Sequence, residues 1–166
     1  GNSMLGRNGC AAVAEALKVN SSLTSLDLKS NKIGDEGAKA IGAALAVSGS
    51  LTSLNVGFNN IGKEVALELV QIFKEKQMTS VSLAKCGLGA DAVKFIAEYV
   101  RTSNSLMSLD IGSNSIGDSG AAAIGNTLKV NGSLTNLDMC NNFIGKKGGV
   151  AIARPWRLRF VSSTAR

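Results

Sequence analysis

One sequence pattern recurs five times along this chain, with a period of about 28 residues. One clear copy, SSLTSLDLKSNKIGDEGAKAIGAAL, begins at Ser21, and a second, NSLMSLDIGSNSIGDSGAAAIGNTL, begins at Asn104. A third copy, GSLTNLDMCNNFIGKKGGVAI, begins at Gly132, and two weaker copies start near Leu51 and Met78. A repeat of this length is a single supersecondary unit that cannot bury its own apolar face, so its copies must stack. The repeat therefore predicts an elongated fold built in layers.

Aligning the copies gives columns of equivalent residues. Alternating apolar columns predict a short strand in each copy, with Leu26 and Leu28 facing inward in the first. These columns are Leu23, Leu51, Met78, Leu106 and Leu134, then Leu26, Leu54, Val81, Leu109 and Leu137, then Leu28, Val56, Leu83, Ile111 and Met139. An amide column follows, with Asn31, Asn59, Cys86, Asn114 and Asn142. A glycine column, suited to a tight or positive-φ turn, contains Gly34, Gly62, Gly89, Gly117 and Gly145.

The second half of each copy predicts an amphipathic helix. Ala38, Ile41 and Leu45 recur at helical spacing, and the small residues among them allow close packing against a sheet. Asp35 and Asp118 fall near the predicted helix starts, where a negative charge suits the helix dipole. The predicted boundaries are a partial repeat at 1–20, repeats at 21–48, 49–76, 77–103, 104–131 and 132–153, and a separate basic tail or cap at 154–166.

The aligned columns resemble the motif LxxLxLxxN/C of the leucine-rich repeat family over roughly residues 2–153. The helical second half is similar to the ribonuclease-inhibitor-like subclass, which includes the repeats of Ran GTPase-activating proteins and NOD-like receptors. The resemblance implies an α/β fold, a right-handed leucine-rich-repeat solenoid shaped as a horseshoe arc. Its parallel sheet would be concave and its helices convex. The resemblance also implies that the amide column pairs buried backbone groups, with Cys86 an allowed variant.

Charge and composition exclude several function classes. The net charge is +6, yet the last 13 residues contain Arg154, Arg157, Arg159 and Arg166 and no acid, and the rest of the chain has 14 basic and 12 acidic residues. The basic balance is therefore weak evidence for nucleic acid. The chain has no histidine, which excludes His-dependent catalysis and His-ligated metal. Its three cysteines, Cys10, Cys86 and Cys140, are too widely spaced for a disulfide framework or a CxxC metal site.

From this composition we expect no enzyme activity, no cofactor, no metal and no small-molecule substrate. The sequence has no uninterrupted apolar run of about 18 residues, so we expect no membrane span. The first residues, GNSMLGRNGC, have no signal-peptide pattern. Together with free cysteines and the resemblance, this favours a cytoplasmic protein.

The variable strand positions between the leucines form the candidate binding surface on the concave face. The candidate partner-binding residues are Asp27, Lys29, Asn55, Phe58, Ser82, Lys85, Asp110, Asn136 and Asp138. Asp110 and Asp138 fall on neighbouring strands, about 4.8 Å apart, and would form an acidic strip for a basic partner. Phe58 is the only aromatic residue among them and would be the anchor. The alternative for each residue is a solvated position with no partner.

Catalysis is the weaker interpretation of these positions. Asp110 and Asp138 could act as an acid–base pair, but the pattern supplies no nucleophile, metal cluster or pocket beside them. Cys86 is expected to be a buried ladder residue. Cys140 is expected to be exposed, with no neighbour that lowers its thiol pKa.

Both ends of the chain fall inside a repeat. We therefore expect the strand at 23–28 to be an edge that could pair end to end with a second copy. In the tail, Pro155 interrupts the last predicted helix. The leading hypothesis is a protein-interaction module. The resemblance implies one alternative, a regulator of a Ran-type GTPase, and the basic tail suggests another, contact with nucleic acid.

Overall fold

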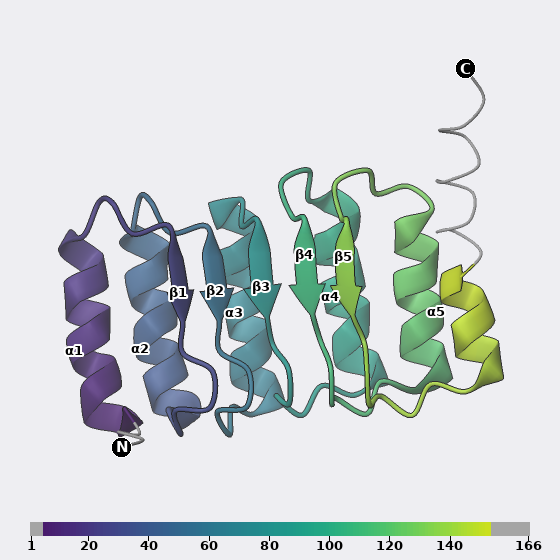
Figure 1. The fold of residues 1–166 in the computed structure, drawn as a ribbon, viewed down its shortest axis with the longest axis horizontal. Coiled ribbons are helices and arrows are strands. Elements are labelled where there is room, and N and C mark those ends of the chain that lie inside the picture. Colours follow the sequence, from purple (N-terminus) through teal and green to yellow (C-terminus); the bar gives the residue numbers. More distant parts are fainter. Residues whose placement is uncertain (1–4, 154–166) are drawn as a thin grey trace.

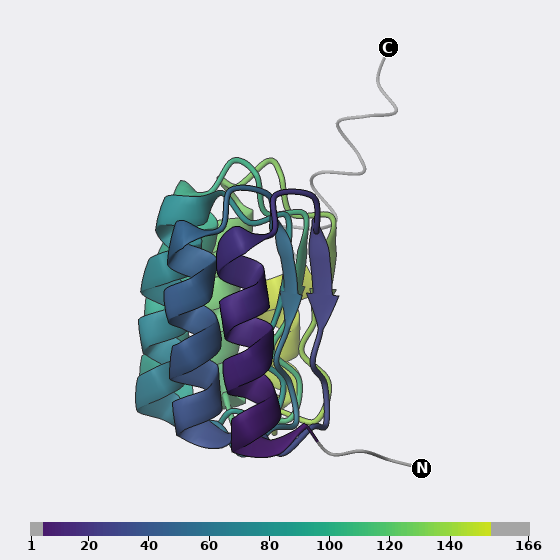
Figure 2. The same cartoon turned by 90° about the vertical axis from the view of Figure 1, so that its left-hand side faces the viewer.

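The computed structural model describes residues 5–153 and has the predicted layered, right-handed solenoid architecture. The described strands form one parallel sheet in chain order, and each connection passes through a helix behind the sheet (Figure 1). Viewed from its end, the molecule has two layers, with helices on one side and the sheet on the other (Figure 2). The elements are α1 Gly6–Val19, β1 Ser25–Asp27, α2 Gly34–Val47, β2 Ser53–Asn55, α3 Lys63–Lys76, β3 Ser80–Ser82, α4 Ala90–Thr102, β4 Ser108–Asp110, α5 Gly117–Leu128 and β5 Asn136–Asp138, and residues 146–153 are also helical.

The strand register matches the sequence columns. Leu26 pairs with Leu54, Leu54 with Val81, Val81 with Leu109, and Leu109 with Leu137. The pairing stays in register although the step from Leu54 to Val81 is one residue shorter than the others. The missing residue is taken from the connection between α3 and β3, which spans only 77–79. The columns therefore describe neighbours in space as well as in the alignment.

The core is a continuous aliphatic stack between the two layers. Interior residues such as Ile41, Leu109 and Ile124 are at most 1% exposed. Leu23 differs from the rest of its column, because it is 38% exposed whereas its equivalents are at most 2% exposed. No strand lies outside β1 in the part of the chain that the structure describes, and Leu23 lines an open hollow there with Val13, Ala16 and Leu17 of α1. The exposure of Leu23 agrees with the prediction that this strand is an edge only partly covered by the helix before it.

The amide column forms a hydrogen-bonded ladder between repeats. Oδ1 of Asn114 accepts the backbone N–H groups of Cys86 at 2.8 Å and Leu88 at 3.1 Å. Its Nδ2 donates to the carbonyls of Leu83 at 2.8 Å and Ile111 at 3.0 Å. One side chain thus satisfies buried backbone groups in two successive turns, which would otherwise be costly to bury. Asn59 and Asn142 make equivalent bonds to their own neighbours.

At one position of this ladder the side chain is the thiol of Cys86 and not the carboxamide of an asparagine. Its thiol donates to the carbonyl of Ala84 in its own turn, with a sulfur–oxygen distance of 3.6 Å. Burial raises the pKa of this thiol to about 12, with smaller contributions from the charges of Asp110 and Asp35. Cys86 is therefore a neutral, buried structural residue, as the sequence predicts.

A second polar ladder lies at the other end of the strands and was missed by the sequence analysis. Oδ1 of Asn131 accepts the N–H groups of Ser133 at 3.1 Å and Leu134 at 2.9 Å. Its Nδ2 donates to the carbonyls of Val100 at 2.7 Å and Ser103 at 2.8 Å in the preceding repeat. The pattern Asn or Ser, any residue, then Ser-Leu recurs at 20–23, 48–51, 103–106 and 131–134. Asn20 and Ser103 accept the N–H of the leucine three residues later within their own turn, whereas the Ser48 hydroxyl has no partner among the described residues.

The glycine column does not have one common conformation. Gly34 and Gly117 have positive φ angles of 62° and 64°, as the turn interpretation predicts. Gly62 and Gly89 have φ angles of −77° and −94° and precede α3 and α4. The expectation of positive φ therefore holds in only part of the column.

Candidate interaction surface

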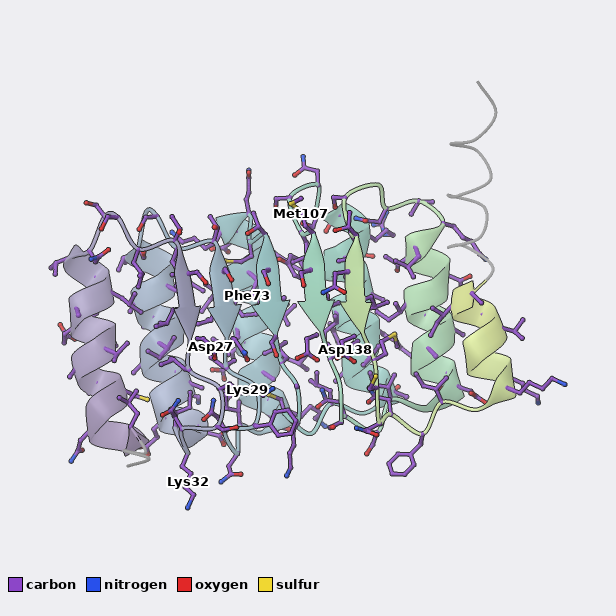
Figure 3. All side chains as sticks on the ribbon, in the orientation of Figure 1. Asp27, Lys29, Lys32, Phe73, Met107 and Asp138 are labelled. Atoms are coloured by element: carbon purple, nitrogen blue, oxygen red, sulfur yellow. The ribbon has the colours of Figure 1, made fainter. Side chains whose placement is uncertain are left out.

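The structure separates the candidate residues into two groups. Asp27, Asn55, Ser82, Asp110 and Asp138 end the five strands and lie in register across the sheet, and Asn136 begins β5. Figure 3 shows Asp27 and Asp138 on the outermost strands, β1 and β5, with Lys29 beyond the end of β1.

Lys29, Phe58 and Lys85 were expected among the strand positions, and this placement is wrong. Each strand is only three residues long, and these side chains follow it in the turn. Phe58 and Lys85 have φ angles of 60° and 53°, in the left-handed region. Ser30, Ser113 and Asn141, their equivalents in the other repeats, have the same conformation. The left-handed backbone is thus a property of the repeat and not a special feature of Phe58.

The row of residues that ends the strands has a structural role. Oδ1 of Asp27 accepts the N–H of Lys29 at 2.8 Å, and Oδ1 of Asp138 accepts the N–H of Cys140 at 2.8 Å. Bonds from a side-chain oxygen to the N–H two residues later stabilise turns. Asn55 and Asp110 make the same bond, to the N–H groups of Gly57 and Gly112.

The predicted acidic strip, Asp110 and Asp138, is less available to a partner than the sequence suggests. Ser82 is only 8% exposed, and its hydroxyl donates to Oδ2 of Asp110 at 2.8 Å. Both carboxylate oxygens of Asp110 therefore have partners within the chain. Asp138 is exposed and its Oδ1 is occupied. Asp110 and Asp138 therefore lie side by side as predicted, but the Asp138 carboxylate is the more accessible of the two to a partner.

The cysteines show no sign of activation. Cys140 is exposed, and its hydrogen bond with Asp138, together with the charges of Asp138 and Asp110, raises its thiol pKa. Burial raises the pKa of the Cys10 thiol. A reactive cysteine needs the opposite shift. Among residues 5–153, no group of three or more acidic or cysteine side chains is placed to hold a metal ion.

Lys29, Phe58 and Lys85 converge although they come from three successive repeats. The ammonium of Lys29 lies 5.1 Å from the centroid of the Phe58 ring, and that of Lys85 lies 5.8 Å from it. Both distances are within the range of cation–π attraction. We call these three residues the basic–aromatic cluster. The aligned columns did not predict this cluster, because Lys29 lies in a different column from Phe58 and Lys85 and an alignment does not give the directions of side chains.

The lysines of the cluster are free of acidic partners. Within the described part of the chain, neither ammonium has a carboxylate within 4.0 Å. Several basic residues on the helices are paired, as in Lys39–Glu68 and Lys94–Asp91. Phe58 is 37% exposed, so an apolar surface accompanies the two charges. The cluster can therefore accept a carboxylate and an apolar group together.

Two hollows among the described residues lie away from the candidate residues. One of about 410 Å³ lies at the rim, lined by residues 101–104 and 130–133. Another of about 250 Å³ lies between α2 and α3. Neither includes a candidate residue.

The parallel register, the helical layer and the amide ladder define an α/β leucine-rich-repeat solenoid. A family model described as Leucine Rich repeat matches residues 19–42, 48–69 and 102–125. These segments contain β1, β2 and β4 with the first parts of the helices that follow them. The matches support a leucine-rich repeat protein.

Two solved structures share this fold. A Caenorhabditis elegans tropomodulin C-terminal domain superposes with a TM-score of 0.73 at 12% identity, over 93% of this chain and 98% of that one. A structure named Leiomodin-1 Actin-Binding Site 2 gives a TM-score of 0.69 at 15% identity, over 90% of this chain and 91% of that one. At such identities the similarity is one of fold. No curated protein matches the chain. None of the helices among residues 5–153 is long and apolar enough to cross a membrane.

Proposed function

We propose that this chain is a non-enzymatic protein-interaction module that binds its partner at the basic–aromatic cluster, in the turns that follow β1, β2 and β3, and along the adjoining strand ends. The observation that carries the proposal is the convergence on the half-exposed ring of Phe58 of two ammonium groups that have no carboxylate partner among residues 5–153. The leucine-rich-repeat fold supports it, because solenoids of this kind present extended surfaces to partners.

The cluster favours an acidic partner segment with an adjacent apolar side chain. Carboxylates would pair with Lys29 and Lys85, and an apolar group would cover the ring of Phe58. Burying such charge pairs beside an aromatic face strengthens both electrostatic and cation–π attraction. Asp27, Asn55, Asn136 and Asp138 would line the remainder of the contact surface, with Ser82 and Asp110 supporting it from partly buried positions.

A photo-cross-linking experiment tests the location of the surface. A benzophenone amino acid replaces Phe58 in one variant and Phe95 in a matched control. Phe95 lies on α4 in the helical layer and is 54% exposed, so both probes reach solvent. We expect one protein from the source-cell lysate to cross-link at position 58 and not at 95. A product that forms only at position 95 would move the site to the helical face.

Actin is the first named protein to try as a partner. The name of the leiomodin-1 structure assigns an actin-binding site to that protein, and this chain shares its fold. The test is binding of the full chain to monomeric actin by fluorescence titration and to filaments by co-sedimentation. Saturable binding that Phe58→Ala weakens more than Phe95→Ala would identify actin as a partner.

Two other functions remain as alternatives to test. For a Ran-type GTPase regulator, the measurement is GTP hydrolysis by Ran with and without the chain, and an unchanged rate would end that alternative. For nucleic-acid contact, the arginines concerned are in 154–166, outside the described residues. That alternative requires steeply salt-dependent binding that disappears when 154–166 is removed.

A further inference from the structure

The charge carried by the strand ends and the turns that follow them changes sign along the sheet. Lys29 and Lys85 of the basic–aromatic cluster follow β1 and β3, and Lys32 lies further along the first turn. Asp110 and Asp138 are the last residues of β4 and β5. The basic residues therefore belong to the first three strands and the acidic pair to the last two, as the labelled lysines and Asp138 show in Figure 3.

The two ends carry opposite net charges. From the last residue of each strand to the fifth residue after it, the segments at 27–32, 55–60 and 82–87 contain three lysines and one acid, Asp27, which leaves a net charge of +2. The segments at 110–115 and 138–143 contain only the two aspartates as charged residues, a net charge of −2. Asp27 thus reduces the positive charge at its end without cancelling it.

The acidic pair keeps its negative charge. Asp110 and Asp138 are neighbours in the register of β4 and β5. Among residues 5–153, no ammonium or guanidinium group lies within 4.0 Å of either carboxylate. Their hydrogen-bond donors are neutral: Ser82 and Gly112 for Asp110, and Cys140 for Asp138. Two adjacent carboxylates without a countercharge attract a cationic group.

The distance between the two ends fits a short extended segment. Phe58 follows β2 and Asp138 ends β5, which is three strand steps further along the sheet. With neighbouring strands about 4.8 Å apart, the separation is about 14 Å, which an extended chain spans in about four residues. The Debye length at physiological ionic strength is about 8 Å, so each end attracts its own part of a bound segment.

Small residues lie between the two ends. The column that begins with Lys29 and ends with Cys140 contains Gly57, Ala84 and Gly112 between them, and all three are buried. A Cβ on Gly57 would already lie 3.1 Å from the Cβ of Ala84, so these turns pack closely. No long side chain of this column therefore separates the basic–aromatic cluster from the acidic pair.

We propose that the partner binds as an extended segment that crosses the strand ends in one orientation. An acidic and apolar part of the segment lies at the basic–aromatic cluster, and a basic residue about four positions away pairs with Asp138. The inference rests on the proposed function, because the cluster is one of its two ends, and it adds the partner's second charge, its spacing and its orientation.

Two synthetic peptides with blocked ends test the spacing, in titrations of the full chain followed by amide NMR shifts. The first is Glu-Leu-Glu-Ser-Gly-Lys, in which the lysine comes four residues after the leucine. The second has serine in place of that lysine. We expect the first peptide to bind about two- to fivefold more tightly at low ionic strength, the effect of one exposed charge pair.

A nitroxide label added after the lysine of the first peptide tests the orientation. We expect it to broaden the amide signals of Met139 and Cys140 more strongly than those of Gly57 and Lys85. The same label added before the first glutamate should give the reverse pattern. Strongest broadening near Phe58 from a label on the lysine end would contradict the orientation.

Charge variants of the chain test the role of Asp138. Asp138→Asn keeps an acceptor for the N–H of Cys140 and removes the charge, so it should abolish the difference in affinity between the two peptides. Asp91→Asn makes the same change on α4, at an exposed residue paired with Lys94, and should preserve the difference. A difference that survives in Asp138→Asn would overturn the assignment of the basic residue to Asp138.

The variant Phe58→Ala separates failure of this inference from failure of the proposed function. It should weaken the binding of both peptides, because both place leucine at the cluster. Equal affinities of the two peptides for the native chain, both weakened by Phe58→Ala, would overturn the inference and leave the proposed function standing. Absence of binding, or binding that Phe58→Ala leaves unchanged, would overturn both.

Discussion

Oδ1 of Asp118 accepts the backbone N–H groups of both Gly145 and Gly148, at 2.7 Å and 2.9 Å. Asp118 lies in the first turn of α5, and the two glycines lie at the start of the following helix, in the next repeat. The equivalent residue Asp35 accepts only one such hydrogen bond, from the N–H of Gly62 at 2.7 Å. The acids that the sequence places at helix starts therefore also join successive repeats.

The two aspartates should differ in their contribution to stability. Asp118 is half-buried and its carboxylate satisfies two N–H groups, so Asp118→Ala should lower the free energy of unfolding by about 1–3 kcal/mol. Asp35 is exposed and satisfies one, so Asp35→Ala should cost about 0.5–1.5 kcal/mol. Urea denaturation measures both values. Asp118→Asn keeps an acceptor oxygen and should recover most of the loss. A larger cost at Asp35 than at Asp118 would contradict this account.

Restoring an amide at position 86 should stabilise the protein. Asn114 and Asn142 each accept N–H groups of the preceding repeat, and the Cys86 thiol bonds within its own turn instead. Cys86→Asn should extend the ladder to the N–H of Asn59 and raise the free energy of unfolding by about 0.5–1.5 kcal/mol.

Thermal and urea denaturation would measure this change. Cys86→Ala removes the thiol without adding an amide, and serves as the matched control that should lower stability. A Cys86→Asn protein less stable than Cys86→Ala would show that this turn does not accommodate the ladder.

Gly125→Ala should destabilise the protein, opposite to the usual effect within a helix. Alanine normally favours a helix over glycine by about 1 kcal/mol. A Cβ on Gly125 would clash with the backbone carbonyl oxygen of Ala151, in the next helix. We expect a net loss of about 1–3 kcal/mol, as for other overpacked contacts. Gly49→Ala is the control, since a Cβ there meets nothing within 4 Å. A stabilising Gly125→Ala change would mean that the two helices do not pack this closely.

Cys140 should become more reactive when Asp138 loses its charge. The hydrogen bond and charge of Asp138 raise the thiol pKa, so the thiolate is scarce near pH 8. Asp138→Asn keeps an acceptor for the Cys140 N–H, lowers the thiol pKa and should speed alkylation by iodoacetamide at pH 8. The difference should vanish at a pH well above both thiol pKa values. Asp27→Asn, at the other end of the sheet, should leave the rate unchanged, and a slower reaction of Asp138→Asn would contradict the assignment.

The repeated columns were sufficient to predict the architecture. Strand register, layer order and the amide ladder follow from apolar residues and asparagines that recur at one period, because each repeat sits in nearly the same surroundings. Leu23 is more exposed than its equivalents in the other repeats because its surroundings change at the edge of the sheet. The ladder at Asn131 was missed because only four short segments carry its pattern.

The candidate surface could be predicted only in part. The row from Asp27 to Asp138 was found from its column, but its hydrogen bonds to the turns depend on where each strand ends. The contacts of Lys29 and Lys85 with Phe58 depend on the directions of long side chains from three turns. Such directions follow from backbone conformation, including the left-handed φ at Phe58, and not from spacing.

The central claim is that the basic–aromatic cluster binds the partner, and one affinity comparison tests it most directly. The partner that cross-links at position 58 is titrated with the native chain, with Phe58→Ala and with Phe95→Ala, each first confirmed to be folded. We predict that Phe58→Ala weakens binding at least about tenfold, as expected of an anchor residue, and that Phe95→Ala has no effect. Unchanged affinity for Phe58→Ala, or an equal loss for both variants, would contradict the claim.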